Sequence, residues 1–402
     1  MGKGDIRTRP LTAFLCSFLL LLAAAPTPSH GSAWRWQNPL PQGNTLHTVW
    51  SARSGEVFAA GDRGTILVFS PALQTPVVFS NTTTNDILAL WGTSSRDVFA
   101  AGASGTILHF DGSEWITMHS GTREHLWGVW GSAPNDVFAV GSGGTILHYD
   151  GNSWQPMKSP TTKTLRSVWG ISRELVFAAG YDGTVVRYNG VDWSVEQVGT
   201  HRDLYCIKGI SGIDVFAAGA EGTLLHFDGA AWKPLNSPDL RGDFSCLAAG
   251  YDGMVFVATQ KGDVFSYNGK KIIKLTSPPV PGGLTGMCRT PDGLLYLVGS
   301  MGTFLCGDTG TWNSLATGLR TEFSTIGRGH GNDVIASGSG GAFAVYDGVA
   351  WRQVDAGMTK GVSAVWRDAA SDKIFVVGEK GMIRRHDGRS WHEMTSPTSE
   401  NL

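Results

Sequence analysis

A segment of about 40 residues recurs along this chain, and its clearest copy covers residues 126–154. One glycine marks the same point in each copy and recurs every 39 to 41 residues, with Ala258 in its place once. Similarity at a fixed period indicates a fold built by stacking one supersecondary unit. Nine copies begin near Leu46, Leu88, Leu126, Leu165, Leu204, Phe244, Leu284, Phe323 and Val362.

Each copy contains four short runs typical of strands. In the clearest copy these are LWGVWG, DVFAV, TILHY and SWQPMK, separated by glycine-rich or Asp-Gly joints. Apolar runs of this length between turn signals suit buried strands. Units of about 40 residues with four antiparallel strands are the blades of a β-propeller. The sequence therefore predicts an all-β fold, a single propeller of four-stranded antiparallel blades.

The joints between strands carry two different turn signals. Asp150-Gly151 predicts a type I′ hairpin, whose two central residues need positive φ. The joint at residues 141–144 has a closing glycine in every copy, which predicts a type I turn ending in a left-handed glycine with a bulge. In a four-stranded meander these joints lie at opposite ends of the blade. The Gly-x-x-Gly joints should share their end with the segments that connect successive blades.

The number of blades is open between nine and eight. Nine copies favour nine blades, and eight would result if one terminal copy lay outside the ring. Trp36 and Trp391 both resemble the tryptophan of a fourth strand, so either end of the chain could complete the last blade.

The repeat resembles the BNR or Asp-box propellers, especially the photosystem II assembly-factor type. The residues that carry the resemblance are Gly141-x-x-Gly144-Thr145-Ile146 and Asp150-Gly151-x-Ser153-Trp154. An Asp-box has five steps from its aspartate to its tryptophan, whereas this chain has four. The resemblance implies a propeller. Its family includes both sialidase-type glycosidases and non-catalytic binding proteins, so no single activity follows.

The amino terminus predicts export. Basic residues precede an apolar segment at residues 11–25, which is shorter than the roughly 20 residues of a membrane span. We expect a signal peptide at residues 1–33, an N-terminal strand at 34–44, the propeller at 45–397 and a tail at 398–402. No later segment predicts a membrane span, and a net charge of −2 does not suggest nucleic-acid binding.

No residue pattern in the chain predicts catalysis. His109, His148 and His226 occupy one position in three copies, which a ring would spread apart, so we interpret them as structural. The aspartates of the Asp-Gly joints are replaced by Asn189 and Asn268 in two copies, as turn geometry allows. Nucleophile, phosphate-loop and metalloprotease signatures are absent from the sequence. Tryptophans 50, 91, 130, 169 and 366 predict packing between blades, or alternatively an aromatic arc near the central channel.

We therefore expect an exported, monomeric, non-enzymatic propeller that binds a macromolecule or scaffolds an assembly, without cofactor or metal. The alternatives are a sialidase-like glycoside hydrolase or lyase, and a glycan-binding module. Variable residues at the tips of rigid strands favour recognition. We predict that a protein or glycan contacts the Gly-x-x-Gly end, whereas Asn152 and Lys270 mark the opposite end. The predicted contact residues are Arg63, Tyr181, Asp182, Glu221, Lys261 and Lys380.

Four cysteines follow the predicted signal. Cys206 and Cys246 occupy the same position on the first strands of adjacent copies, where blades lie closest together. Export permits disulfides, and a bridge would need the two Cα atoms within about 7 Å. A Cys206–Cys246 disulfide is therefore one hypothesis and four buried thiols the other. No bridge is expected between Cys288 and Cys306.

Overall fold

The computed structural model describes residues 44–402 with ten gaps. The predicted signal peptide, and all of the predicted N-terminal strand except Asn44, lie outside the described residues. None of the helices in the described part has the length and apolarity to cross a membrane. The gaps are residues 71–75, 80–81, 251, 279, 281–282, 309, 316–322, 329–332, 347–350 and 369–372.

The chain folds as a β-propeller repeat protein with nine four-stranded antiparallel sheets, as the sequence predicted. Each sheet is a meander in chain order, and we number the sheets 1 to 9. Sheets 1 to 4 comprise β1 Leu46–Ser51, β2 Val57–Gly61, β3 Ile66–Phe69, β4 Val77–Phe79; β5 Ile87–Ser94, β6 Asp97–Gly102, β7 Ile107–Phe110, β8 Trp115–Met118; β9 Leu126–Ala133, β10 Asp136–Gly141, β11 Ile146–Tyr149, β12 Trp154–Pro156; β13 Leu165–Ser172, β14 Leu175–Gly180, β15 Val185–Tyr188 and β16 Trp193–Glu196.

The remaining sheets have the same composition. Short 3₁₀ turns follow the second strand of six sheets: η1 Asp62–Gly64, η2 Ala103–Gly105, η3 Ser142–Gly144, η4 Ala220–Gly222, η5 Ser339–Gly341 and η6 Glu379–Gly381. Sheets 5 to 9 comprise β17 Leu204–Ser211, β18 Asp214–Gly219, β19 Leu224–Phe227, β20 Trp232–Pro234; β21 Phe244–Ala249, β22 Val255–Thr259, β23 Val264–Tyr267, β24 Ile272–Lys274; β25 Leu284–Arg289, β26 Leu295–Gly299, β27 Phe304–Gly307, β28 Trp312–Ser314; β29 Phe323–Arg328, β30 Val334–Gly338, β31 Phe343–Tyr346, β32 Trp351–Gln353; β33 Val362–Asp368, β34 Lys373–Gly378, β35 Met382–His386 and β36 Trp391–Glu393.

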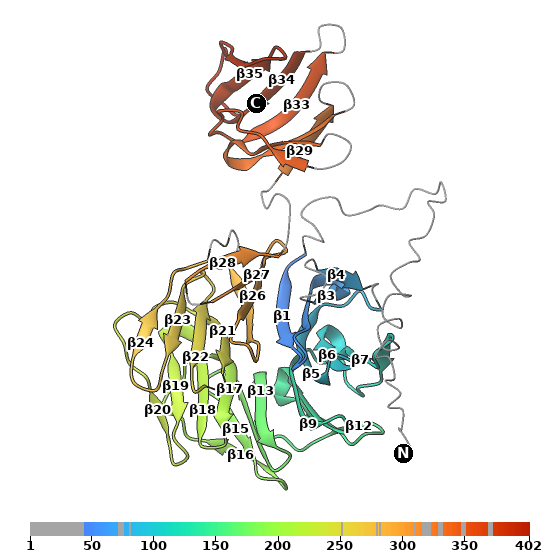
Figure 1. The fold of residues 1–402 in the computed structure, drawn as a ribbon, viewed down its shortest axis with the longest axis vertical. Helices are drawn as coiled ribbons and strands as arrows, with labels where there is room; N and C mark the ends of the chain where they lie inside the picture. Colours follow the sequence, from blue (N-terminus) through green and yellow to red (C-terminus); the bar gives the residue numbers. More distant parts are fainter. Residues whose placement is uncertain are drawn as a thin grey trace, which may run out of the picture. The chain divides into compact units, whose positions relative to one another are not determined.

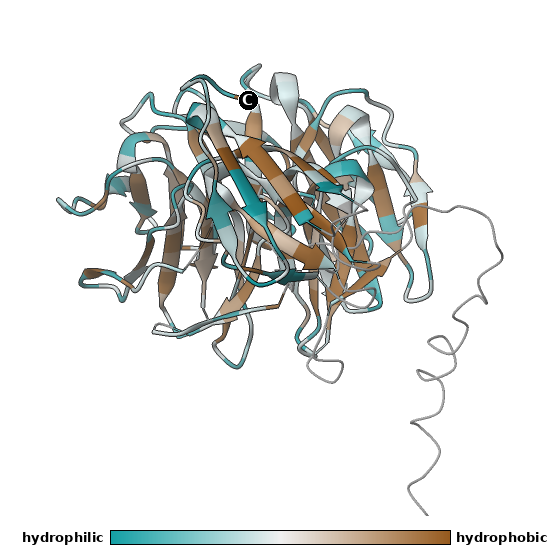
Figure 2. Ribbon diagram, turned by 90° about the horizontal axis from the view of Figure 1, so that it is seen from above, coloured by the Kyte–Doolittle hydropathy of each residue, from teal (hydrophilic) through white to brown (hydrophobic). Residues whose placement is uncertain are grey.

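The second strand of each unit is the most apolar because it lies in the middle of its sheet. Strand β10 is buried at every residue, whereas β12 at the sheet edge exposes Gln155 and Pro156. Figure 2 shows hydrophobic residues concentrated along the strands and hydrophilic residues in the connecting loops. Burial on both faces explains why these strands read as continuous apolar runs rather than alternating ones.

Sheets 1 to 7 close into a ring (Figure 1). Strand β1 packs against β25, and the Thr285 hydroxyl donates a hydrogen bond to the carbonyl of Leu46. The Ser51 hydroxyl donates to the carbonyl of Arg289 at 3.3 Å. Phe69 and Phe304 belong to one apolar cluster that joins the first sheet to the seventh. We call these seven sheets the ring.

Sheets 8 and 9 pack against each other, and we call them the C-terminal pair. Ile335 and Phe343 share a cluster with Val362 and Val376, and the Ser324 hydroxyl donates to the carbonyl of Val362 at 2.9 Å. The nine predicted units are thus confirmed, but seven of them form the ring where eight or nine were expected. The difference arises because closure depends on contacts between copies far apart in the chain, which the repeat pattern does not encode.

In most sheets neither kind of joint has the turn type predicted for it. At the Gly-x-x-Gly joint of sheet 1, Arg63 and Gly64 both have positive φ, 55° and 68°, and the Thr65 N–H donates to the Asp62 carbonyl at 3.0 Å. This pattern fits a type I′ turn, whose twist matches that of the flanking strands. Only sheet 6 keeps the predicted form, with positive φ at Gly262 and not at Lys261.

The Asp-Gly joints are closed by the aspartate side chain. In sheet 3, Asp150 Oδ1 accepts hydrogen bonds from the N–H groups of Asn152 at 2.8 Å and Ser153 at 2.9 Å, and only Gly151 has positive φ. Asn189 makes the same two bonds in sheet 4. The predicted turn role of these residues is therefore confirmed, and the turn is an Asx-type one.

Candidate functional site

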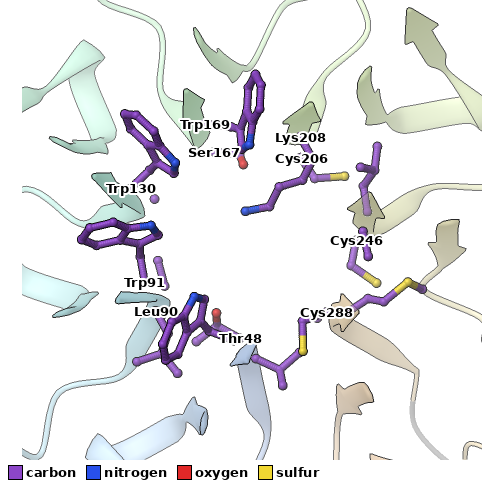
Figure 3. A pocket seen from close by; sticks show the side chains of 18 of the residues that line it. Thr48, Leu90, Trp91, Trp130, Ser167, Trp169, Cys206, Lys208, Cys246 and Cys288 are labelled. Carbon is purple, nitrogen blue, oxygen red and sulfur yellow. The ribbon is translucent and has the colours of Figure 1, made fainter. Parts of the chain in front are cut away.

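The first strands of sheets 1 to 7 surround a central cavity of about 1230 Å³. These are β1, β5, β9, β13, β17, β21 and β25, so every sheet of the ring contributes to the wall (Figure 3). The cavity is the channel of the propeller. Side chains from all seven sheets of the ring converge on it.

Four tryptophans at one repeat position form part of the channel wall. Each lies against a glycine of the next sheet: a Cβ built on Gly131 would lie 2.6 Å from Cη2 of Trp91, and one on Gly170 would lie 2.6 Å from Cη2 of Trp130. The rings of Trp91 and Trp130 are 6.5 Å apart. Packing between sheets and an aromatic arc on the channel are both found for four of the five predicted tryptophans, namely Trp50, Trp91, Trp130 and Trp169. Trp366, in sheet 9, is 60% exposed and is not among the channel-lining residues.

The other part of the channel wall carries Lys208 and three cysteines. Lys208 occupies the tryptophan position in sheet 5, and its pKa is lowered by burial in the channel. Burial raises the pKa of Cys246 and of Cys288 to about 12, and it raises that of Cys206 further. The four cysteines after the predicted signal are free thiols. The predicted Cys206–Cys246 disulfide stays a hypothesis for the oxidised protein.

An aromatic and cationic cluster lies beside the channel at the Gly-x-x-Gly end. The guanidinium of Arg166 lies 3.7 Å from the ring centroid of Trp127 and 5.9 Å from that of Tyr181. The rings of Tyr181 and Tyr205 pack edge to face, 6.5 Å apart. Arg166 Nε is buried without a hydrogen-bond partner, and burial lowers the Arg166 pKa. We call these four residues the mouth cluster; Trp127, Arg166 and Tyr205 also line the channel.

A second group lies at the same end in sheets 1 and 2. His47 Nε2 is 2.6 Å from Asp62 Oδ1, and Asp86 Oδ1 accepts a hydrogen bond from the Arg63 N–H at 2.9 Å. One potential metal-ligating atom from each of His47, Asp62 and Asp86 lies within 4.8 Å of the others. Imidazole and carboxylate ligands suit a divalent cation. These three residues are the only such group found among the described residues.

The six predicted contact residues are exposed at joint tips outside the channel wall. Four of the tips are held by other segments at this end: the N–H groups of Arg63, Asp182 and Glu221 donate to Asp86, Asp203 and Asp243, each in the segment that precedes the next sheet, and that of Lys380 donates to Asn401. The Asp62 N–H donates to the Thr45 carbonyl at 2.9 Å, in the segment that precedes sheet 1. The Gly-x-x-Gly joints and the connecting segments therefore share one end, as predicted.

The six predicted contact residues lie in different surroundings. Tyr181 joins the mouth cluster, and Asp182 pairs with Lys163 at 2.9 Å. Glu221 pairs with Arg202 at 3.0 Å. Lys380 belongs to the C-terminal pair and not to the ring. The contact role of the six residues stays a prediction.

The three histidines have structural surroundings. His109 stacks on Phe99 with ring centroids 4.3 Å apart, and its Nε2 lies 2.6 Å from Asp97 Oδ1. His148 makes the same pair of contacts with Phe138 and Asp136. Each of these histidines thus links the third strand of its own sheet to the first residue of the second strand.

Sequence reasoning did not single out Lys208, Trp127 and Arg166. A signal for Lys208 was present, since LYCIKG in copy five places lysine where the four preceding copies have tryptophan. Trp127 and Arg166 occupy a position that varies from copy to copy, and no pattern links them. Their contact exists only because sheets 3 and 4 are neighbours in the ring.

Comparisons with known proteins support the fold. No family model matches the sequence, and no curated protein matches it. Solved structures that resemble this one include the WD40 repeats of RRP9, with 15% identity, a TM-score of 0.54, and coverage of 64% of this chain and 88% of that one. The WD40 β-propeller domain of Doa1 has 11% identity, a TM-score of 0.54, and coverage of 67% and 95%.

A further similar structure is an enzyme. The GH74 enzyme of Niastella koreensis has 11% identity and a TM-score of 0.59, with coverage of 92% of this chain and 75% of that one. At these identities the likeness establishes the propeller fold alone, because one such fold carries many unrelated functions.

Proposed function

We propose that this chain is an exported β-propeller that binds a protein partner at the Gly-x-x-Gly end of the ring, without catalysing a reaction. The observation that carries the proposal is the mouth cluster. Tryptophan, tyrosine and arginine are the residues most enriched at the energetic centres of protein interfaces. Here Trp127, Arg166, Tyr181 and Tyr205 lie together on first strands and joints of a rigid ring.

The cluster has the organisation expected of a contact surface. Arg166 is fixed by stacking on Trp127, so little side-chain freedom would be lost on binding. Charged tips lie beside it, with Asp182 next to Tyr181 on the same joint and Glu221 on the next joint along the ring. An aromatic centre with a polar rim is the usual anatomy of an interface. Export rests on the apolar segment at residues 11–25, and kinship with the Asp-box propellers rests on the repeat motif.

The proposal is tested by pull-down from the native envelope with matched variants. We expect Arg166→Met with Tyr205→Ala to lose the partner that the parent chain retains. Asn152→Ala with Lys270→Ala, at the Asp-Gly end, should retain it. Circular dichroism and thermal unfolding confirm that each variant is folded. Equal recovery of the partner by both double variants would contradict the proposal.

The predicted contact residues extend the test. Replacing Arg63, Asp182, Glu221 and Lys261 by alanine should weaken the same complex by a smaller factor, because exposed charges at an interface rim contribute little. Lys380→Ala tests the C-terminal pair separately. Unchanged affinity in the fourfold variant would restrict the contact to the mouth cluster.

A glycoside hydrolase is the second candidate, favoured by one observation. Asp62 and Asp86 place carboxylate oxygens within 4.8 Å of each other beside the channel. Retaining glycosidases use two carboxyl groups about 5 Å apart. Release of sugar from a panel of glycosides by the parent chain, lost in Asp62→Asn, would support this alternative over the binding role. A glycan array tests the third possibility, a glycan-binding module.

A further inference from the structure

Hydrogen-bond donors converge on the central channel from several sheets. Figure 3 shows the indole nitrogens of Trp91, Trp130 and Trp169 and the ammonium nitrogen of Lys208 on the sides of these residues that face the channel. An indole N–H and an ammonium group donate hydrogen bonds and accept none. The four residues come from sheets 2 to 5, so their donors approach one space from different directions.

These donors have no partners within the described part of the chain. Two half-buried tryptophans do have partners, since Trp312 Nε1 donates to the Thr276 carbonyl at 2.9 Å and Trp127 Nε1 donates to the Ser142 hydroxyl at 3.1 Å. The indole nitrogens of Trp115, Trp154 and Trp232 also lack partners, but they are buried. No protein hydrogen bond or ion pair is found for Lys208 or for the indole nitrogens of Trp91, Trp130 and Trp169 among the described residues. Unsatisfied donors facing a cavity are available to a ligand.

No acidic side chain lies among the neighbours of Lys208 in the channel wall. Cys206, Cys246 and Cys288 are neutral thiols at physiological pH, because burial raises their pKa values far above it. Asp62 and Asp86 are the only aspartates in the channel lining of the described residues. They come from the Gly-x-x-Gly joint of sheet 1 and the segment before sheet 2.

Four hydroxyl groups of the channel wall make hydrogen bonds with the backbone. Ser167 accepts a hydrogen bond from the Ile207 N–H at 3.2 Å, and Ser51 donates to the Arg289 carbonyl. Thr285 and Ser245 donate to the carbonyls of Leu46 and Ala258. Among the described residues, none of these four hydroxyls is found hydrogen-bonded to the indole or ammonium donors.

We propose that the central channel binds a tetrahedral oxyanion, free or as the head group of a larger ligand, through Lys208 and the indole N–H groups of Trp91, Trp130 and Trp169. A phosphate or sulfate group presents acceptor oxygens in several directions, which matches donors arriving from four sheets. The site goes beyond the proposed function, because it lies inside the channel and does not depend on a protein partner at its mouth.

Titration of the full chain with inorganic phosphate at constant ionic strength tests the proposal. We expect saturable shifts of indole ¹H–¹⁵N resonances together with a saturable rise in the thermal unfolding temperature. Lys208→Met should weaken phosphate binding by about tenfold or more, since the bond to a charged donor is lost. Trp130→Phe, which removes one indole N–H and keeps an aromatic ring, should weaken it by a smaller factor.

Three controls make the outcome decisive. Lys270→Met removes an exposed lysine at the Asp-Gly end and should leave the response unchanged. Sulfate should reproduce the response to phosphate, and chloride should not. The proposal is overturned if phosphate and sulfate give no saturable response, if chloride gives the same one, or if Lys208→Met binds phosphate as tightly as Lys270→Met. If Lys208→Met fails to fold, the Trp130→Phe titration decides alone, and an unchanged response there overturns the role of the indole.

Discussion

The ring and the C-terminal pair are built from the same repeat, but equivalent side chains are buried in the ring and exposed in the C-terminal pair. Trp130 in sheet 3 is 7% exposed, whereas Trp366 at the same position in sheet 9 is 60% exposed. Val129 and Ile326 differ in the same way, at 6% and 67%. Each tryptophan pairs across its own sheet with an equivalent phenylalanine, Phe138 or Phe375. The strand register is thus the same in both regions.

The difference shows that a sheet of this repeat does not bury its own tryptophan. The ring of Trp130 is covered by Gly170 of the following sheet, and Trp366 has no following sheet in the described structure. The strand register of a sheet is therefore determined within each copy, whereas the burial of its tryptophan depends on contact with the neighbouring copy. A repeat protein whose units touch only their neighbours should behave in this way.

The largest difference in stability between the two regions is expected when their tryptophans are replaced. Trp130→Ala should lower the free energy of unfolding of the ring by about 3–5 kcal/mol, the usual cost of truncating a buried aromatic residue. Trp366→Ala should change stability by less than about 0.5 kcal/mol, as expected for an exposed position. Denaturant unfolding followed by circular dichroism measures both. Equal losses would show that Trp366 is covered in solution.

A smaller effect is expected at the glycines that receive the tryptophans. A Cβ on Gly170 would lie 2.6 Å from the Trp130 ring and 2.9 Å from the Leu175 carbonyl oxygen. Gly170→Ala should therefore destabilise the ring by about 1–3 kcal/mol through overpacking. Gly310→Ala is the matched control, since its nearest contact would be 3.8 Å away. A neutral Gly170→Ala would mean that adjacent sheets separate at little cost.

The smallest effect concerns the Asp-Gly turns, where the two regions should behave alike. Hydrogen bonds from the Ser113 hydroxyl and the backbone N–H groups of Glu114 and Ser113 lower the pKa of Asp111 from 3.8 to about 2. Backbone N–H groups and His392 likewise lower the pKa of Asp387 in the C-terminal pair. Because each folded-state pKa is depressed, the carboxylate stabilises the fold above pH 3.8. This contribution is lost for Asp111 as the pH falls toward about 2.

The test compares unfolding temperatures between pH 5 and pH 2. Asp111→Asn should reduce the acid dependence while leaving stability near neutral pH almost unchanged, because Asn189 and Asn268 already form the same turn. Asp387→Asn should do the same in the C-terminal pair. A steeper loss of stability in acid for either variant would contradict the hydrogen-bond origin of the shifts.

Much of the local structure could be predicted from the sequence. Nine units, four strands in each, the antiparallel order and the end occupied by each joint all follow from periodicity and turn residues. Asn189 occupies in one copy the position that Asp150 has in another, and this replacement correctly indicated a role in the turn. The turn types themselves were predicted wrongly, because both joints contain glycine. The φ of the residue before that glycine, 55° at Arg63, depends on the twist of the strands that it joins.

The sequence by itself determined what each copy is: a four-stranded sheet with an apolar second strand, an Asx-type turn and an inner tryptophan where the copy keeps one. These properties depend on interactions within about 40 residues. Only the tertiary structure decided that the ring closes between sheets 1 and 7, that Arg166 stacks on Trp127, and that Lys208 faces the same channel as three indoles. Each of these depends on which copies are neighbours in space. The packing of whole sheets decides which copies become neighbours. The repeat pattern does not specify this, because the copies are nearly identical.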